Sequence, residues 1–300
     1  RLYDMAQAFG TLANNGVRVP TFGIVGITDA SGAEVPMPER TGPVQAVQPQ
    51  IAYLMQSILS DNEARSAAFG LNSGLALPAY PGLVGAKTGT SNDSRDLWTV
   101  GFTRGAVVGV WIGRVDNNPT VNTSGLAAVP IWNTVMQAVL QGTSPEPFTN
   151  PGGVVEQQIC ADTGTIYDPN VTQNCTAVRT ELFLVNQPPP PASQAFIQTI
   201  PVDTWTNLRA NQYCPDHIRT GTFATIDDAS AIQWLNTPQG AAYAQQLGLT
   251  TPIEPLPTGE CSPSTIQPQV RITSPTDAQQ VMGVVQVQGT VTANNLNRYQ

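Results

Sequence analysis

The sequence is poor in charged residues and has almost no lysine. Charged residues make up 11% of its 300 residues, and its 13 basic residues are 12 arginines and the single lysine Lys87. The formal net charge is −8. Because binding to nucleic-acid phosphates requires clustered Lys and Arg side chains, this balance argues against a nucleic-acid partner.

Three further absences narrow the possible functions. No apolar run approaches the roughly 18 residues of a membrane-spanning helix, and the chain does not open with a basic-then-apolar export signal. His217 is the only histidine, which argues against a Ser-His-Asp triad. It follows Cys214, but no Cys-x-x-Cys pair or other ligand stands at a metal-binding spacing. We therefore expect no metal site and no cofactor.

Four cysteines are present, all in the second half of the chain: Cys160, Cys175, Cys214 and Cys261. An even number of cysteines in a loop-rich sequence is typical of disulfides in an oxidising compartment. Four cysteines allow three pairings. We expect Cys160–Cys175 and Cys214–Cys261, because each pair would then close one module. The alternative is four reduced, buried cysteines.

The first half of the chain predicts helices around an antiparallel sheet, an α+β layered fold. Apolar residues at helical spacing, with proline opening the second and third segments, predict helices over residues 2–13, 49–59 and 130–140. Apolar and β-branched runs predict strands over residues 17–29, 84–90, 97–103 and 106–113. A turn is expected at residues 29–32 and a hairpin turn at residues 104–105.

Two of these segments carry predictions about packing. In the second helix an apolar stripe is expected to pack in the core, and it consists of Ile51, Leu54, Met55, Ile58 and Leu59. Residues 106–112 are apolar throughout, which predicts a strand that is covered on both faces.

After about residue 142 the chain becomes rich in proline and loop residues. A linker over residues 142–147 leads into a small strand module that carries the first two cysteines. Residues 188–191 are four consecutive prolines, which predict a stiff, extended spacer.

Short helices and then strands are expected beyond this spacer. Thr237 is placed to cap a helix that Pro238 opens and Gly248 ends. Residues 270–275 and 281–291 predict the opening strands of a β-sandwich-like segment. We therefore expect four regions with these boundaries: 1–145, 146–191, 192–265 and 266–300.

The single lysine stands in a tetrad of chemically informative residues: Lys87, Thr88, Gly89 and Thr90. Lys-Thr-Gly is the third signature of the serine enzymes that bind penicillin, beside Ser-x-x-Lys and Ser-x-Asn. A Ser-x-x-Lys motif cannot occur in this chain, because its only lysine follows Val84 by three residues. Either the chain is a fragment of such an enzyme, or the tetrad occurs here by chance.

Several segments around the tetrad make the pattern more specific. They occur in order and are Met5-Ala6-Gln7-Ala8-Phe9 with Asn15-Gly16-Val17; Ile58-Leu59-Ser60-Asp61 with Ala64-Arg65; the tetrad; Asp96-Leu97-Trp98; and Gly101-Phe102-Thr103 with Val110-Trp111-Ile112-Gly113. Through them, residues 1–145 resemble the C-terminal part of the transpeptidase domain of class A, bifunctional penicillin-binding proteins. The remaining residues resemble tail modules of some of these proteins.

The resemblance implies a reaction and a role for the tetrad. A serine would attack the D-Ala-D-Ala bond of a peptidoglycan stem, and an amine of a neighbouring stem would take the acyl group. Lys87, Thr88 and Thr90 would bind the substrate carboxylate. Gly89 would let the extended substrate lie against the strand. The Thr90 backbone N–H would be one oxyanion donor.

The resemblance also implies a setting for the intact parent protein. It would carry an N-terminal glycosyltransferase and a membrane anchor, act on stem peptides and the lipid-linked precursor, and be inhibited by β-lactams. Its place would be the extracytoplasmic face of the bacterial membrane, in the periplasm or cell-wall space. Without the nucleophile motif, this chain alone is expected to be inactive.

Two alternative functions stay open. One is a non-catalytic cell-wall-binding or scaffolding protein on a degenerate transpeptidase fold, with the tail doing the binding. The other keeps the fold but changes the reaction to that of a D,D-carboxypeptidase or β-lactamase.

Other residues near the tetrad are interpreted as structural. Ser60, Asp61 and Asn62 match the Ser-Asp-Asn signature of β-lactamases, but they stand only 25 residues before the tetrad, at a helix end. Asp93 and Asp96 are expected to cap the turn after it. Trp98 and Trp111 are expected in the core, with Trp98 near enough to border a cleft.

Overall fold

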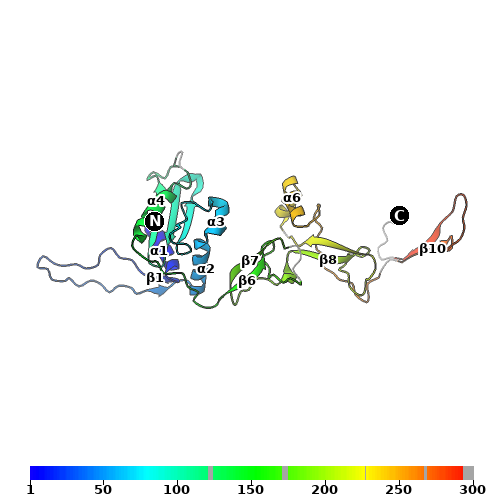
Figure 1. Ribbon diagram of the computed structural model, residues 1–300, viewed down its shortest axis with the longest axis horizontal. Helices are drawn as coiled ribbons and strands as arrows, with labels where there is room; N and C mark the ends of the chain where they lie inside the picture. The colour runs from blue at the N-terminus through cyan, green and yellow to red at the C-terminus, as the bar shows by residue number, and fades with distance from the viewer. Residues whose placement is uncertain (121–123, 171–174, 227, 267–268, 293–300) are drawn as a thin grey trace. The chain divides into compact units, whose positions relative to one another are not determined.

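The computed structural model describes residues 1–120, 124–170, 175–226, 228–266 and 269–292 (Figure 1). The chain divides into two compact units. Unit 1 comprises Arg1–Glu156 and Leu182–Pro188, and unit 2 comprises Gln157–Glu181 and Pro189–Gln300. None of the helices in the described ranges is long and apolar enough to cross a membrane. The finer division into four regions stays a prediction.

A three-stranded antiparallel sheet forms the centre of unit 1. Its strands follow the order β3 (Gly85–Thr90), β4 (Asp96–Phe102) and β5 (Val107–Gly113). The Thr103 N–H donates to the Ala106 carbonyl at 2.9 Å and closes the predicted hairpin turn. The strands therefore lie where the apolar runs predicted them, and they confirm the antiparallel sheet of the expected α+β fold.

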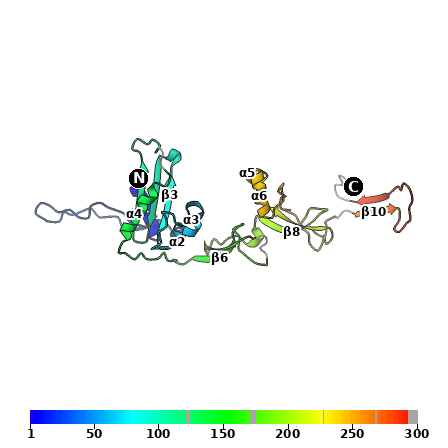
Figure 2. The same ribbon diagram turned by 45° about the horizontal axis from the view of Figure 1, so that its top comes forward.

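Helices cover both faces of this sheet (Figures 1 and 2). On one face, Phe9 of α1 (Leu2–Ala13) and Leu59 of α2 (Pro49–Ser60) pack with Phe102. On the other face, Trp132 and Met136 of α4 (Ala128–Leu140) pack with the sheet and the loop before it. The face with α4 holds the larger cluster of buried side chains. The prediction that β5 is covered on both faces is only partly correct. Val108 is buried beneath α4, whereas Trp111, which was expected in the core, is 38% exposed.

Two glycines make room for large rings, one on helix α4 and one on the neighbouring strand β4. A Cβ on Gly101 would lie 2.2 Å from the indole of Trp132, and a Cβ on Gly85 would lie 2.7 Å from the ring of Phe102. Trp132 and Phe102 are both fully buried. The absence of these side chains from the strands therefore makes room for the largest rings of the core.

The prediction for the inward face of α2 was partly wrong. Met55 and Leu59 contact the core, but Ile58 is 64% exposed, and the buried positions include Gln56. The Gln56 amide donates to the Leu12 carbonyl at 2.7 Å, at the C-terminal end of α1. Because this hydrogen bond satisfies the buried amide nitrogen, the helix turns a polar residue inward and leaves part of the apolar stripe in solvent.

The strand predicted over residues 17–29 was also wrong in its length. Only Val17–Arg18 (β1) forms a strand, and it pairs with Val44–Gln45 (β2). The segment between them is an exposed loop that extends from the helices of unit 1 (Figure 1). An apolar run forms a longer strand only where a partner strand continues beside it. The predicted turn at residues 29–32 is present, and the Gly32 N–H donates to the Asp29 carbonyl at 3.0 Å.

Small two-stranded sheets and short helices follow the core of unit 1. β6 (Val154–Cys160) pairs with β7 (Val178–Leu184), and β8 (Ile197–Asp203) pairs with β9 (Ile218–Ala224). After them come α5 (Ala229–Leu235) and α6 (Pro238–Gln246). Remaining short elements are α3 (Asn62–Phe69), η1 (Asn92–Ser94) and η2 (Ala192–Gln194).

The predicted start of α6 is confirmed. The Thr237 hydroxyl accepts a hydrogen bond from the Gly240 N–H at 3.2 Å, and Pro238 takes the first helical position. Gly248 follows the helix with a positive φ of 75°, a conformation that glycine adopts without steric cost.

The proline-rich segment is not a free spacer as predicted. Pro189 is buried, and the Pro190 carbonyl accepts a hydrogen bond from the Ile166 N–H at 2.8 Å. Prolines lack an N–H, but their carbonyl groups remain acceptors, and here one of them ties the segment to the cysteine-bearing module.

The C-terminal segment contains one hairpin, formed by β10 (Gln269–Ser274) and β11 (Gln288–Thr292). The first predicted strand is confirmed, whereas the second begins only at Gln288 rather than at residue 281. Residues 267–268 and 293–300 of the predicted sandwich-like region lie outside the described residues. Both predicted disulfides, Cys160–Cys175 and Cys214–Cys261, are present.

Candidate functional site

The tetrad occupies an edge strand of the sheet. Within the described ranges, β3 pairs with β4 and with no other strand. The Ala86 carbonyl accepts from Nη1 of Arg65 at 3.5 Å, and the Thr88 carbonyl accepts from Nζ of Lys87 at 2.7 Å. These two carbonyls therefore point away from β4. Since backbone groups alternate in direction along an antiparallel strand, the N–H and C=O of Thr90 also point to the open edge.

The tetrad side chains divide between the two faces of β3. Lys87 lies opposite Val100 and Gly89 opposite Trp98, whereas Thr88 and Thr90 point to the other face. Lys87 and Thr90 are exposed. Among the described residues Lys87 takes part in no ion pair. The ammonium group of the only lysine is thus available to an anionic ligand at the sheet edge.

Gly89 differs from the packing glycines of the same sheet. A Cβ on Gly89 would lie 3.6 Å from Cβ of Trp98, which is an ordinary van der Waals distance. Its φ is not positive, unlike that of Gly70 or Gly82. Neither packing nor backbone conformation therefore requires glycine here, and a close-lying ligand is a physical reason for it.

The turn after the tetrad is held by Asp96. Its Oδ2 accepts from the Ser91 hydroxyl at 2.9 Å, and its Oδ1 accepts from Nε1 of Trp111 at 2.9 Å. The Ser91 hydroxyl in turn accepts from the Asp96 N–H at 2.9 Å. Both carboxylate oxygens are engaged, so Asp96 fixes the turn as predicted. The half-buried ring of Trp98 packs against Trp111, with 6.4 Å between ring centroids.

Arg65 ties the start of β3 to the helices, a role that the sequence analysis missed. Its guanidinium donates to the Leu59 carbonyl, to the Asp61 carbonyl at 3.2 Å and to the Ala86 carbonyl. Burial lowers the pKa of Arg65, and the negative charge of Asp61 opposes that shift. An arginine four residues after Asp61, at the spacing of one helical turn, was the available signal. Because it bonds the residue before Lys87, Arg65 positions the tetrad strand.

Ser60, Asp61 and Asn62 lie at the junction between α2 and α3. The Asp61 carboxylate accepts from the Ala64 N–H at 2.9 Å and caps α3. The Asn62 amide donates to the Leu71 carbonyl at 2.9 Å. These bonds agree with the interpretation of this triplet as a helix end.

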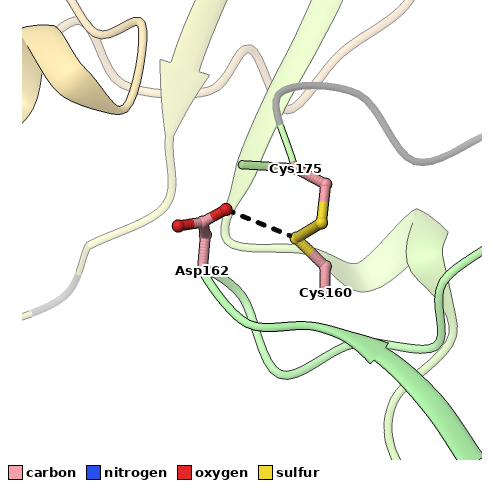
Figure 3. A group of neighbouring side chains, drawn as sticks. All are labelled: Cys160, Asp162 and Cys175. Carbon is pink, nitrogen blue, oxygen red and sulfur yellow. Dashed lines mark hydrogen bonds between the residues drawn. A yellow bond between two sulfur atoms is a disulfide. The ribbon is translucent and has the colours of Figure 1, made fainter. Parts of the chain in front are cut away.

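The cysteine modules contain the two groups of clustered metal-ligand side chains found in the described part of the chain. One consists of Cys160, Asp162 and Cys175 (Figure 3). The other consists of Asp203, Cys214 and Cys261. His217 belongs to neither group. Its ring stacks on that of Trp205, with 3.8 Å between the ring centroids.

Comparison with known proteins finds penicillin-binding proteins that are similar to about half of the chain. Over 161 residues the chain is 34% identical to penicillin-binding protein 1A of Neisseria flavescens, which covers 50% of this chain and 19% of that protein. Over 160 residues it is 32% identical to penicillin-binding protein 1B of Vibrio cholerae, which covers 52% of this chain and 20% of that protein. Over about half of its length, the chain therefore resembles class A penicillin-binding proteins. It spans about a fifth of the length of these curated relatives.

The fold of a solved penicillin-binding protein agrees with the predicted fold class. The crystal structure of penicillin-binding protein 1A from Haemophilus influenzae matches with a TM-score of 0.51 at 21% identity, covering 63% of this chain and 32% of that chain. No family model matches the chain. The resemblance to class A penicillin-binding proteins and the predicted fold class are therefore confirmed, whereas the roles of the tetrad residues stay predictions.

Proposed function

We propose that unit 1 carries the carboxylate-binding half of a peptidoglycan D,D-transpeptidase site, in a parent protein that forms an acyl-serine intermediate. The observation that carries this proposal is the open edge of β3. It presents an unpaired ammonium group, two threonine hydroxyls and an outward backbone N–H over the four residues of the tetrad.

These groups match the substrate at each point. The terminal carboxylate of a stem peptide needs a cation and hydroxyl donors, which Lys87, Thr88 and Thr90 supply. An extended peptide would pair with the free edge as an added strand, and Gly89 leaves room for it. The Thr90 N–H would stabilise the oxyanion that forms when a serine oxygen attacks the D-Ala-D-Ala carbonyl. The terminal D-Ala then leaves, and an amine of a neighbouring stem takes the acyl group.

The setting of the parent follows from the same proposal. It includes an N-terminal glycosyltransferase, a membrane anchor, the lipid-linked precursor as a further substrate, and a site on the extracytoplasmic face of the membrane. β-Lactams would acylate the same serine. Because residues 1–300 contain no Ser-x-x-Lys motif, we expect this chain alone to form no acyl-enzyme.

Mass spectrometry with a β-lactam tests the proposal. We expect no covalent adduct on this chain and one adduct per molecule on a version extended upstream by about one domain length. In the extended version, Lys87→Ala should slow acylation on the order of 100-fold, the scale of losing one transition-state contact. Arg104→Ala changes a cation at the hairpin turn and serves as the matched control with an unchanged rate.

The absent nucleophile motif favours a second candidate, a non-catalytic cell-wall-binding or scaffolding protein. If the extended version also lacked an adduct, this candidate would replace the transpeptidase. An adduct that hydrolyses rapidly, with release of free D-Ala and no cross-linked product, would instead indicate a D,D-carboxypeptidase or β-lactamase-type reaction.

A further inference from the structure

Asp203 is a buried carboxylate with an unexplained oxygen. Asp203 is fully buried and is the last residue of β8. Oδ2 accepts from the Thr206 N–H at 2.9 Å and from the Thr206 hydroxyl at 2.6 Å. Oδ1 has no hydrogen-bond partner, and Asp203 is in no ion pair among the residues that the structure describes. A buried carboxylate without a cation is costly, so this position is suited to a bound cation.

Two sulfur atoms lie next to this carboxylate. The Sγ atoms of Cys214 and Cys261 and a carboxylate oxygen of Asp203 are all within 4.8 Å of one another. All three residues are buried, with exposed fractions of 2% or less. In the oxidised chain the two sulfurs form a disulfide and are not ligands.

Backbone hydrogen bonds also hold both cysteines. The Asn211 carbonyl accepts from the Cys214 N–H at 3.0 Å, and the Asn211 amide donates to the Cys261 carbonyl at 2.7 Å. The Cys261 N–H donates to the Arg209 carbonyl at 3.0 Å. None of these bonds involves a sulfur atom, so in the folded, reduced chain they favour thiol positions near Asp203.

The other disulfide provides an internal contrast (Figure 3). Asp162 lies beside Cys160–Cys175, but both of its oxygens accept hydrogen bonds from Thr176, at distances of 2.6–2.9 Å. Asp162 therefore has a structural function, which is to hold the loop that the disulfide closes. Asp203 differs from Asp162, because its Oδ1 has no hydrogen-bond partner among the described residues.

We propose that Asp203, Cys214 and Cys261 form a zinc site in the reduced chain, as an alternative to the disulfide. A dithiol, or a phosphine with water, supplies the two electrons and two protons that turn the disulfide into two thiols, and is itself oxidised to a disulfide or a phosphine oxide. Zinc binding then displaces both thiol protons, and Oδ1 of Asp203 becomes the third ligand, with a water in the fourth position. Two sulfurs and one oxygen suit zinc better than harder cations.

The geometry is compatible with this exchange. Zinc–sulfur bonds of about 2.3 Å at a tetrahedral angle place the two sulfurs about 3.8 Å apart. The Cα atoms of Cys214 and Cys261 are 6.0 Å apart, and rotation about the side-chain bonds can separate the sulfurs by that amount. No large backbone movement is needed.

Cobalt(II) is the probe for the first experiment, because it substitutes for zinc and its thiolate bonds absorb visible and near-ultraviolet light. A version with Cys160→Ser and Cys175→Ser keeps only the proposed site. We expect one cobalt per reduced chain with thiolate absorption, and none when the disulfide is intact. Asp203→Asn should weaken binding at least tenfold, whereas Asp162→Asn, the matched control, should leave it unchanged. Equal affinity of Asp203→Asn and the parent would overturn the proposal.

Thiol alkylation provides a second test that needs no variant. Zinc should slow alkylation of Cys214 and Cys261 in the reduced full-length chain at least tenfold, with mass spectrometry of peptides locating the protected thiols. Unprotected thiols at saturating zinc would contradict the site. If Asp203→Asn fails to fold, as judged by circular dichroism of its oxidised form, this measurement decides the matter alone.

Discussion

The two units of this chain reach stability by different means. Unit 1 buries Phe102 and Trp132 completely between a three-stranded sheet and helices on both faces, and both disulfides lie in unit 2. Unit 2 has two-stranded sheets and a smaller apolar cluster around Leu235 and Leu249. An isolated two-stranded sheet is marginally stable in water. Loop closure by disulfides therefore supplies in unit 2 what a packed core supplies in unit 1.

This difference also separates the two candidate sites. The tetrad lies on a strand whose position is fixed by core packing and by Arg65, so its geometry depends on apolar contacts. The group formed by Asp203, Cys214 and Cys261 depends on the oxidation state of the chain. Changes that melt one unit should leave the chemistry of the other intact.

Trp132→Ala is expected to have the largest effect. Removing a fully buried tryptophan typically costs about 3–5 kcal/mol. Its indole N–H has no partner among the described residues, so the loss is one of packing alone. Scanning calorimetry should show a lower midpoint temperature for the unfolding of unit 1 and an unchanged midpoint temperature for unit 2. Trp205→Ala, at an exposed tryptophan of unit 2, is the control. A joint shift of both transitions would show that the units unfold together.

Removal of Cys214–Cys261 should have a similar effect on the other unit. The two cysteines are 47 residues apart, and closing a loop of that length stabilises by about 4 kcal/mol in the chain-entropy model. Cys160–Cys175, with a separation of 15, should contribute about 3 kcal/mol. Paired Cys→Ser changes, followed by urea unfolding, measure both values. If either variant destabilised unit 1 as much as unit 2, this result would contradict the division of the chain into two units.

Two glycines in one sheet should respond in opposite ways to alanine. Gly101→Ala would place a Cβ 2.2 Å from Trp132, and overpacking of this kind costs about 1–3 kcal/mol. At Gly89 the added Cβ finds an ordinary contact distance of 3.6 Å, so stability should stay unchanged. In a longer version that contains the serine, Gly89→Ala should nevertheless slow β-lactam acylation. Loss of stability in Gly89→Ala would assign this glycine to packing instead.

The sequence predicted those features that depend on local patterns. Helix starts at Pro49 and Pro238, the strands around the tetrad and the pairing of the cysteines all follow from spacing within a few tens of residues. The burial of Gln56 could not be predicted from its own helix, because the carbonyl that accepts its hydrogen bond lies on α1. The predicted length of β1 was wrong for a similar reason. A strand extends only as far as its partner strand, and the sequence does not reveal that partner.

The candidate sites show the same limit. Lys87 and its neighbours could be predicted as a site because they form a motif of consecutive residues. Arg65 was missed as a positioning residue, because its acceptor, the Ala86 carbonyl, is a backbone atom on a distant strand. The position of Asp203 beside two cysteines depends on the fold of β8 and on the loop that carries Cys261, and no spacing rule connects the three.

Helix caps should give the smallest effects and the closest comparison between the units. The Asp61 carboxylate accepts from the Ala64 N–H at 2.9 Å to cap α3 in unit 1. Asp228 caps α5 in unit 2, accepting from the N–H groups of Ser230 at 2.7 Å and Ala231 at 3.0 Å. Replacing such a cap with alanine costs about 1 kcal/mol.

Each alanine variant should therefore lower only the transition of its own unit. Because α3 also carries Arg65, Asp61→Ala should in addition loosen the start of β3, which amide hydrogen exchange at residues 85–88 would report. Asp228→Ala serves as the control and should leave that exchange unchanged. Faster exchange in both variants would mean that the tetrad strand depends on the whole chain rather than on unit 1. Unchanged exchange in both would show that Arg65 holds the strand without help from the cap.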